Sequence, residues 1–208
     1  MGKRYHVISR RLYVELLEAI KTRRSIRNYT DDPVDEARIN TILEAGQLAP
    51  SWSNTQCWKF IVVRDPQVRA SLAETLMKIE LPDRVVDNPG VKAINTAPVT
   101  IVVCAEIGVS GGKPGGDGSK SGYVTDKGDW FMFDTALAVQ NMCLAAHDMG
   151  LGTVIMGAFD AVAAEKALNV PEGYRITVMI PVGVPAREGK APPRKPLTEL
   201  VINDKWSS

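Results

Sequence analysis

The sequence has few cysteines and no clear excess of either charge. Cys57, Cys104 and Cys143 lie far apart in the 208 residues, which excludes a disulfide scaffold and a closely spaced zinc motif. A formal net charge of +1 argues against binding nucleic acid through a basic surface. No run approaches the ~20 apolar residues of a membrane span, and basic residues 1–11 are not followed by the apolar stretch of a signal peptide. We expect a cytoplasmic protein with no membrane or nucleic-acid partner.

Standard nucleotide-binding and hydrolase motifs are also missing. The glycine clusters at 150–157 and 116–122 miss the G-x-G-x-x-G spacing and the Walker loop. No serine stands in a G-x-S-x-G elbow. Of the two histidines, His147 falls inside a predicted helix without a nucleophile motif, so we interpret it as a structural or surface residue. Cys57 has no plausible base nearby in the sequence. The sequence therefore assigns no catalytic residue and no metal site.

What is present is the composition of a globular protein, with 45% hydrophobic and 24% charged residues. Hydrophobic spacing predicts helices over 11–22, 32–48, 67–79 and 131–149, with another starting near Asp160. Short apolar runs predict strands over 60–63, 99–104, 154–158 and 176–184. Residues 108–122 hold seven of the 17 glycines, which favours a mobile loop over a packed element. Mixed helices and strands indicate an α/β or α+β class and one domain over 1–208, with an extended, proline-rich tail from residue 185.

Two polar segments carry the functional signal. In the segment Arg23-Arg24-Ser25-Ile26-Arg27, an extended chain would point residues 23, 25 and 27 the same way, forming a cradle for a phosphate and a polar ring edge. A solvated basic helix end explains the same residues, and both interpretations stay open. Residues 49–60 combine Ser, Asn and Gln with two tryptophans, which suits a planar heterocycle. The alternative is a plain connection with Trp58 in the core.

Together these segments resemble the opening of the flavin-dependent nitroreductase family. Three later segments agree in order, namely residues 97–103, residues 134–152 and Arg194-Lys195-Pro196-Leu197. The resemblance covers about residues 11–205, and five short motifs in the right order make it specific. It implies an α+β fold with a mostly antiparallel central sheet flanked by helices. It also implies an intertwined homodimer that binds one flavin mononucleotide (FMN) per protomer where the two chains meet.

The resemblance also implies which residues contact FMN. Arg23, Arg24 and Ser25 would contact the phosphate and ribityl chain, and Arg27 the pyrimidine edge of the ring. Arg194 and Lys195 would close over the phosphate. Four residues would reach the ring from the partner subunit: Pro50, Ser51, Trp52 and Asn54. Gly157 and Ala158 would lie beside the ring, with a backbone N–H near its N5 atom.

The activity implied is an NAD(P)H-dependent oxidoreductase that passes electrons from NADH or NADPH to nitroaromatic, quinone or similar flat acceptors by a ping-pong route. Specialised enzymes of the same fold, which remove halogen, fragment flavin or dehydrogenate a ring, are one alternative. A non-catalytic flavin-binding module is another. Trp52 stands where the family commonly has a small hydroxyl residue, and Cys57 stands where it commonly has proline.

Overall fold

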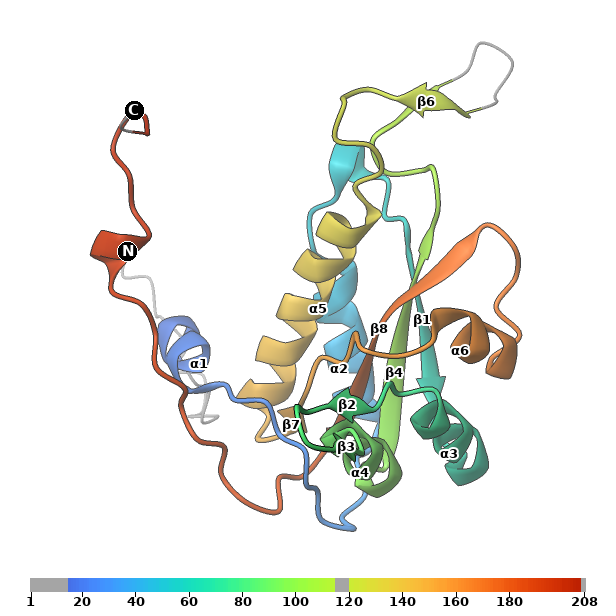
Figure 1. Ribbon diagram of the computed structural model, residues 1–208, viewed down its shortest axis with the longest axis vertical. Helices are drawn as coiled ribbons and strands as arrows, with labels where there is room; N and C mark the ends of the chain where they lie inside the picture. Colours follow the sequence, from blue (N-terminus) through green and yellow to red (C-terminus); the bar gives the residue numbers. More distant parts are fainter. Residues whose placement is uncertain (1–14, 115–119, 207–208) are drawn as a thin grey trace, which may run out of the picture.

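The computed structural model describes residues 15–114 and 120–206. The predicted mixture of helices and strands is present (Figure 1). The helices are α1 (Leu16–Thr22), α2 (Glu36–Gln47), α3 (Pro66–Glu74), α4 (Pro89–Thr96), α5 (Phe131–Asp148) and α6 (Ala161–Ala167), with 3₁₀ turns η1 (Trp52–Asn54) and η2 (Leu197–Glu199). The strands are β1 (Trp58–Val63), β2 (Ile79–Glu80), β3 (Val85–Val86), β4 (Val99–Glu106), β5 (Gly112–Pro114), β6 (Lys120–Tyr123), β7 (Gly152–Thr153) and β8 (Tyr174–Gly183).

The central sheet has the strand order β1-β4-β8-β7, and each neighbouring pair is antiparallel. β4 lies inside the sheet because its apolar, β-branched run is buried on both faces, as the sequence predicted. The predicted α+β class with a mostly antiparallel sheet is therefore confirmed. Of the described helices, none combines the length and apolarity needed to cross a bilayer.

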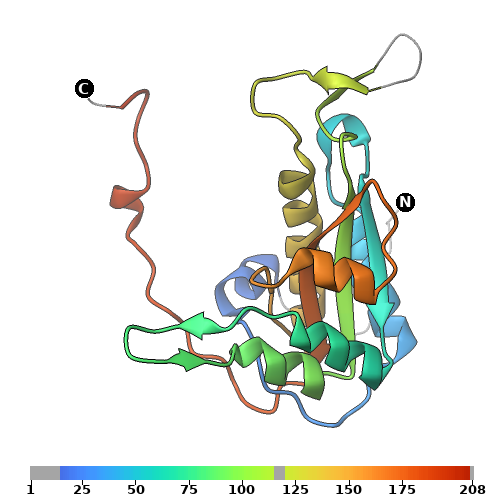
Figure 2. The same ribbon diagram turned by 45° about the vertical axis from the view of Figure 1, so that its right-hand side comes forward.

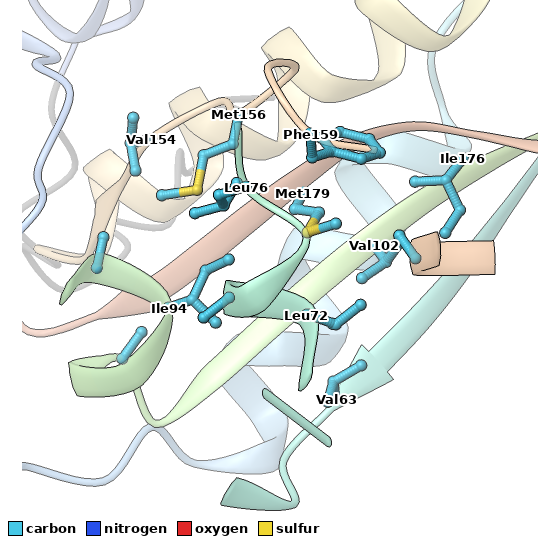
Figure 3. Close-up of a cluster of buried hydrophobic side chains, with 14 of the residues drawn as sticks. Val63, Leu72, Leu76, Ile94, Val102, Val154, Met156, Phe159, Ile176 and Met179 are labelled. Atoms are coloured by element: carbon cyan, nitrogen blue, oxygen red, sulfur yellow. The ribbon is translucent and has the colours of Figure 1, made fainter. Parts of the chain in front are cut away.

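Helices cover both faces of this sheet, and a large hydrophobic core fills each side (Figure 1). Alternate residues of β4 divide between them: Ile101 and Val103 pack toward α2 and α5, and Val102 and Cys104 pack toward α3 and α4. Figure 3 shows the second core, where Leu72 and Ile94 meet Val102 and Met179.

Several predicted boundaries are wrong. The second helix starts at Glu36 rather than near Asp32, because the Asp35 side chain accepts the Arg38 N–H at 2.8 Å and caps it. No strand forms over the predicted residues 154–158: β7 is Gly152–Thr153, and beyond it Met156 makes an isolated antiparallel bridge with Met179 of β8. Beyond Thr153 the chain curves over the sheet, so that Val154, Met156 and Phe159 fill the core (Figure 3).

Other differences lie in shorter elements. The helix predicted over 67–79 ends at Glu74, and α4 and the β2–β3 hairpin were not predicted. Residues 11–14 of the first predicted helix lie outside the described residues, as do 115–119 of the glycine-rich stretch. The described start of that stretch is packed, while the expected mobility of the stretch stays a prediction. Ser110 is fully buried, and β5 and β6 form a hairpin beside the start of α5 (Figure 1).

The C-terminal segment forms an arm that stands away from the body in both views (Figures 1 and 2). We define the arm as residues 192–206. Its apolar side chains are exposed, including Leu197, Leu200 and Val201, and Trp206 is 82% exposed. An exposed apolar segment of this kind is typical of a surface that another molecule covers.

Candidate functional site

The arginine-rich segment forms an extended strand-like stretch between β7 and the chain that follows β8. The Ile26 N–H donates to the Thr153 carbonyl at 2.9 Å, and Ser25 forms a parallel bridge with Thr153. On the other side the Ala186 N–H donates to the Asn28 carbonyl at 3.0 Å. These bonds fix the backbone of residues 25–28, so side chains leave it in alternate directions: Ile26 is buried, while Ser25 and Arg27 are exposed.

Two glycines let the neighbouring backbone approach this segment closely. A Cβ on Gly152 would lie 2.8 Å from the Cβ of Ile26, and one on Gly189 would lie 2.5 Å from the Cβ of Arg24. Both distances are far inside van der Waals contact, so only glycine fits without movement of the segment. We call residues 23–28, with the facing residues 150–153 and 185–191, the cradle.

Gly152→Ala is expected to lower the free energy of unfolding by about 1–3 kcal/mol, because the added methyl overpacks against Ile26 in the cradle. Gly157→Ala is the matched control, since a Cβ there meets nothing within 4 Å. Its effect on stability should stay within about 0.5 kcal/mol. Urea unfolding of both variants measures the difference. Equal stability of the two variants would contradict the close packing at Gly152.

The cradle contains two cavities, one on each side of Ile26. Arg23 and Arg24 line the first, of about 450 Å³, together with His147. Ser25 and Arg27 line the second, of about 460 Å³, which also receives residues 187–190. The expectation that residues 23, 25 and 27 share one side is therefore wrong for residue 23. Arg23 is the C-cap of α1, so the extended alternation begins only after it. Each cavity is of the size typical of a small-molecule site.

Arg23, Arg24 and Glu188 are charged residues that line the first cavity. Nη1 of Arg23 is buried and, among the described residues, has no hydrogen-bond partner. Leaving a charged donor unsatisfied is costly, so this atom indicates a missing acceptor. Burial, with the nearby charges of Arg23 and Arg24, lowers the pKa of His147, whose Nε2 lies 2.8 Å from Thr22 Oγ1. His147, interpreted from sequence as a structural or surface residue, thus lines the cavity as a neutral ring at pH 7. Sequence reasoning missed this position of His147 because a single histidine in an apolar helix carries no motif.

Residues 50–57 of the second polar segment form a loop near the start of α5, whereas the cradle lies near its end. Three of its non-glycine residues have left-handed backbone: Ser53 (φ 46°), Asn54 (φ 56°) and Gln56 (φ 47°). Such conformations are strained and gather at functional sites. Trp52 contacts the Trp130 ring, with centroids 5.0 Å apart. Trp58 lies in the core, as the plain-connection interpretation expected for that residue.

Asp134 fixes this loop and was not among the predicted site residues. It is 1% exposed, and its carboxylate oxygens accept the Trp52 N–H at 3.1 Å. In the sequence, Asp134 is only an acidic residue in the first turn of a predicted helix. The helix dipole favours an acid at that position, so nothing in the sequence assigns it a further role.

The remaining predicted residues are not gathered into one pocket of the protomer. Gly157 and Ala158 are exposed beside the end of α3, where the Met77 N–H donates to the Ala158 carbonyl at 3.0 Å. Arg194 and Lys195 are exposed on the arm. Pro50 and Ser51 stay with the loop near Asp134, which lies 13 helical residues, or about 20 Å along α5, from His147 in the cradle. One protomer therefore separates the two halves of the predicted site.

Cys57 is buried within the loop, with 3% of its surface exposed. Burial, and then the carboxylates of Asp134 and Asp129, raise the pKa of its thiol to about 12. A raised pKa favours the protonated thiol in the folded chain, so its stabilising contribution is present below the ordinary value near 9 and is lost as pH rises toward 12.

We expect the free energy of unfolding to fall between pH 9 and 12 by about 1.4 kcal/mol per pH unit for this group, and to fall less steeply in Cys57→Ser. Denaturant unfolding across that range checks the slope. Rapid labelling of Cys57 by a thiol reagent in the folded protein at pH 8 would contradict the assignment.

These features define an α+β protein with an arginine-lined cradle at the edge of its sheet. The chain belongs to the nitroreductase family, whose sequence profile matches residues 20–184. Within the described residues, no cluster of His, Cys, Asp and Glu could hold a metal ion.

Similar proteins show the range of this family. A protein of Methanothermobacter thermautotrophicus named for NADH dehydrogenase or NAD(P)H nitroreductase activity is 34% identical over 87% of this chain and 83% of its own. An iodotyrosine deiodinase of Nematostella vectensis is 26% identical over 90% of this chain and 74% of its own. A nitroreductase of Desulfovibrio desulfuricans, solved in complex with FMN, is 31% identical with a TM-score of 0.71 over 92% and 98% of the two chains.

Proposed function

We propose that the protein is an FMN-dependent oxidoreductase that passes electrons from NADH or NADPH to nitroaromatic, quinone or similar flat acceptors by a ping-pong mechanism. The observation that carries the proposal is the unpartnered, buried Nη1 of Arg23 in a cavity of about 450 Å³. The phosphate of FMN is an acceptor of the charge and size that this donor lacks. The FMN complex of the similar Desulfovibrio protein supports the choice of anion.

Within the cradle, the chain's own residues bind and orient the cofactor. Arg23, Arg24 and Ser25 would hold the phosphate and ribityl chain, and Arg27 would place a positive charge at the pyrimidine edge of the ring. Arg194 lies three residues beyond Ala191, which lines the first cavity, so it lies within about 11 Å of that residue along the chain. Arg194 and Lys195 are thus within side-chain reach of the phosphate. FMN, when bound, supplies the two-electron transfer, so the chain needs no acid of its own.

We also propose that the working unit is a homodimer, because one protomer cannot assemble the site. The cradle and the loop with Pro50 and Ser51 lie at opposite ends of α5. A two-fold packing of two copies along this helix places the loop of each beside the cradle of the other. The stripe Phe133, Leu137 and Leu144 on α5 supports this packing, since it follows helical spacing and no member is fully buried: Phe133 is exposed, and Leu137 and Leu144 are half-buried.

Met142 lies on the same helix but does not belong to this stripe. Its side chain is 1% exposed and packs inside its own protomer, among the residues of the core beneath α2 and α5. The partner-facing side of α5 is the side that carries Phe133, which is 56% exposed. The exposed apolar arm adds a second surface that a partner copy would cover.

Absorption spectra and steady-state kinetics of the purified protein test the function. We expect flavin bands in the spectrum and NADH or NADPH oxidation that depends on a nitroaromatic or quinone. A protein that binds FMN but turns over neither donor would instead be a binding module. The similarity to an iodotyrosine deiodinase supports dehalogenation as the second candidate. Halide release from an iodinated phenol, faster than reduction of any quinone, would favour that candidate.

A further inference from the structure

Asp134 is a buried carboxylate whose partners belong to two other segments of the chain. It sits in the first turn of α5, accepts the Trp52 N–H of the loop, and accepts the Ser110 hydroxyl at 2.6 Å. The Cys57 thiol lies 3.9 Å from the same oxygen. A carboxylate that is 1% exposed is retained at high cost unless its lone pairs are occupied, and here the loop and the 108–110 segment occupy them.

Asp134 is not needed to start its own helix. The Phe131 N–H at the beginning of α5 is satisfied by the Asp129 carboxylate at 3.0 Å. The other carboxylate oxygen of Asp129 accepts the Gly108 N–H at 2.5 Å and so holds the adjacent segment. Because Asp129 caps the helix, both carboxylate oxygens of Asp134 are free to accept the Trp52 N–H.

The loop that Asp134 holds cannot keep its shape by local preference. Ser53, Asn54 and Gln56 all have positive φ, which residues with a Cβ adopt rarely. Inside the loop, the Ser51 hydroxyl oxygen accepts the Gln56 N–H at 2.9 Å. The two contacts from Asp134 are the anchor that ties this strained turn to the rigid helix.

We infer that Asp134 is a positioning residue that acts across the subunit boundary, because its contacts fix loop 51–57 against the FMN held by the partner's cradle. This inference rests on the proposed function. Within one protomer, Asp134 and the cradle residue His147 are separated by about 20 Å along α5. We therefore assign the loop to the partner's cradle and not to the cradle of its own chain.

Mixed dimers test whether the effect crosses the boundary. One chain carries Arg23→Ala, which disables its own cradle, and the other carries Asp134→Ala, which frees its own loop; different affinity tags isolate the mixed dimer. If Asp134 acts on the partner, one site combines an intact cradle with an intact loop. We expect each homodimer to lose activity by at least about tenfold and the mixed dimer to recover about half of the wild-type activity, with one FMN bound.

A purely structural role, or an effect within one subunit, gives a different result. The mixed dimer would then contain no intact site, and its activity would not exceed that of the two mutant homodimers. Asp134→Asn is the conservative variant, because its amide oxygen still accepts the Trp52 N–H; we expect it to restore activity to within about threefold of wild type. An Asn variant as impaired as the Ala variant would overturn the positioning role.

Two further measurements keep the test decisive. If Asp134→Ala does not assemble, Ser110→Ala replaces it in the mixed dimer, with a smaller expected loss of about threefold and the same recovery. A wild-type protein that binds no FMN would refute the proposed function itself. A wild-type enzyme that binds FMN and turns over, while the mixed dimers fail to recover, would refute only the role of Asp134.

Discussion

Replacing Arg23 and Arg194 together by alanine is expected to weaken FMN binding by about two orders of magnitude or more. Each arginine would make charge-assisted hydrogen bonds to the phosphate, worth roughly 1.5–3 kcal/mol per residue. Because Nη1 of Arg23 has no partner in the described chain and Arg194 is exposed, their loss removes little from the FMN-free fold. The Tm of the FMN-free variant should therefore stay close to that of wild type, while the rise in Tm on adding FMN disappears.

Fluorescence titration with FMN measures this loss directly. The matched control is Arg64→Ala, which removes an arginine whose ion pair with Glu36 lies at the surface. Exposed pairs contribute about 0–1 kcal/mol, so the control should keep wild-type affinity for FMN. Unchanged affinity in the double variant would refute the assignment of the cradle to the phosphate.

Deletion of residues 196–208 is expected to abolish the dimer, and with it FMN binding, although the chain keeps Arg194 and Lys195. The deleted part of the arm carries Leu197, Leu200 and Trp206, which are largely exposed in the protomer. Large apolar side chains of this kind dominate the energy of an interface, so their loss should raise the dimer Kd by more than about a hundredfold.

Analytical ultracentrifugation at micromolar concentration checks the assembly. Val162→Ala is the control, since Val162 is 67% exposed on α6 but lies on the body rather than the arm. That variant should remain dimeric. A truncated chain that sediments as a dimer and stays yellow would show that the arm is not part of the interface.

The sequence predicted the class of the fold because β4 and α5 carry strong local patterns. An unbroken apolar run gave the inner strand, and an almost wholly apolar stretch gave the long helix. Predictions failed where tertiary contacts decide the conformation. Residues 154–158 have strand-like side chains, yet only Met156 pairs with β8, through a single antiparallel bridge to Met179, while Met156 and Phe159 bury their side chains in the core. The glycines near Ser110 predicted a mobile backbone, yet Gly111 permits close packing against Trp130.

The candidate site was predictable only in part, for a similar reason. Arg23 and Arg27 stand out in a short basic segment, whereas Asp134 and His147 are single polar residues in an apolar helix. Their partners are 82 and 125 residues away in the chain, so no local spacing could reveal them. The glycines that shape the cradle, Gly152 and Gly189, matter through what a Cβ would strike, which only the folded chain defines.

In the proposed dimer, the length of α5 sets the distance between the loop and the cradle of each protomer. Asp134 near one end and His147 near the other serve two different FMN sites, so both their separation and their angular relation must be kept. One residue inserted between them would shift one end by about 1.5 Å and rotate it by about 100°. Either the loop or the cradle would then miss its cofactor. In the proposed dimer, geometry therefore fixes the number of residues between the two ends of this helix.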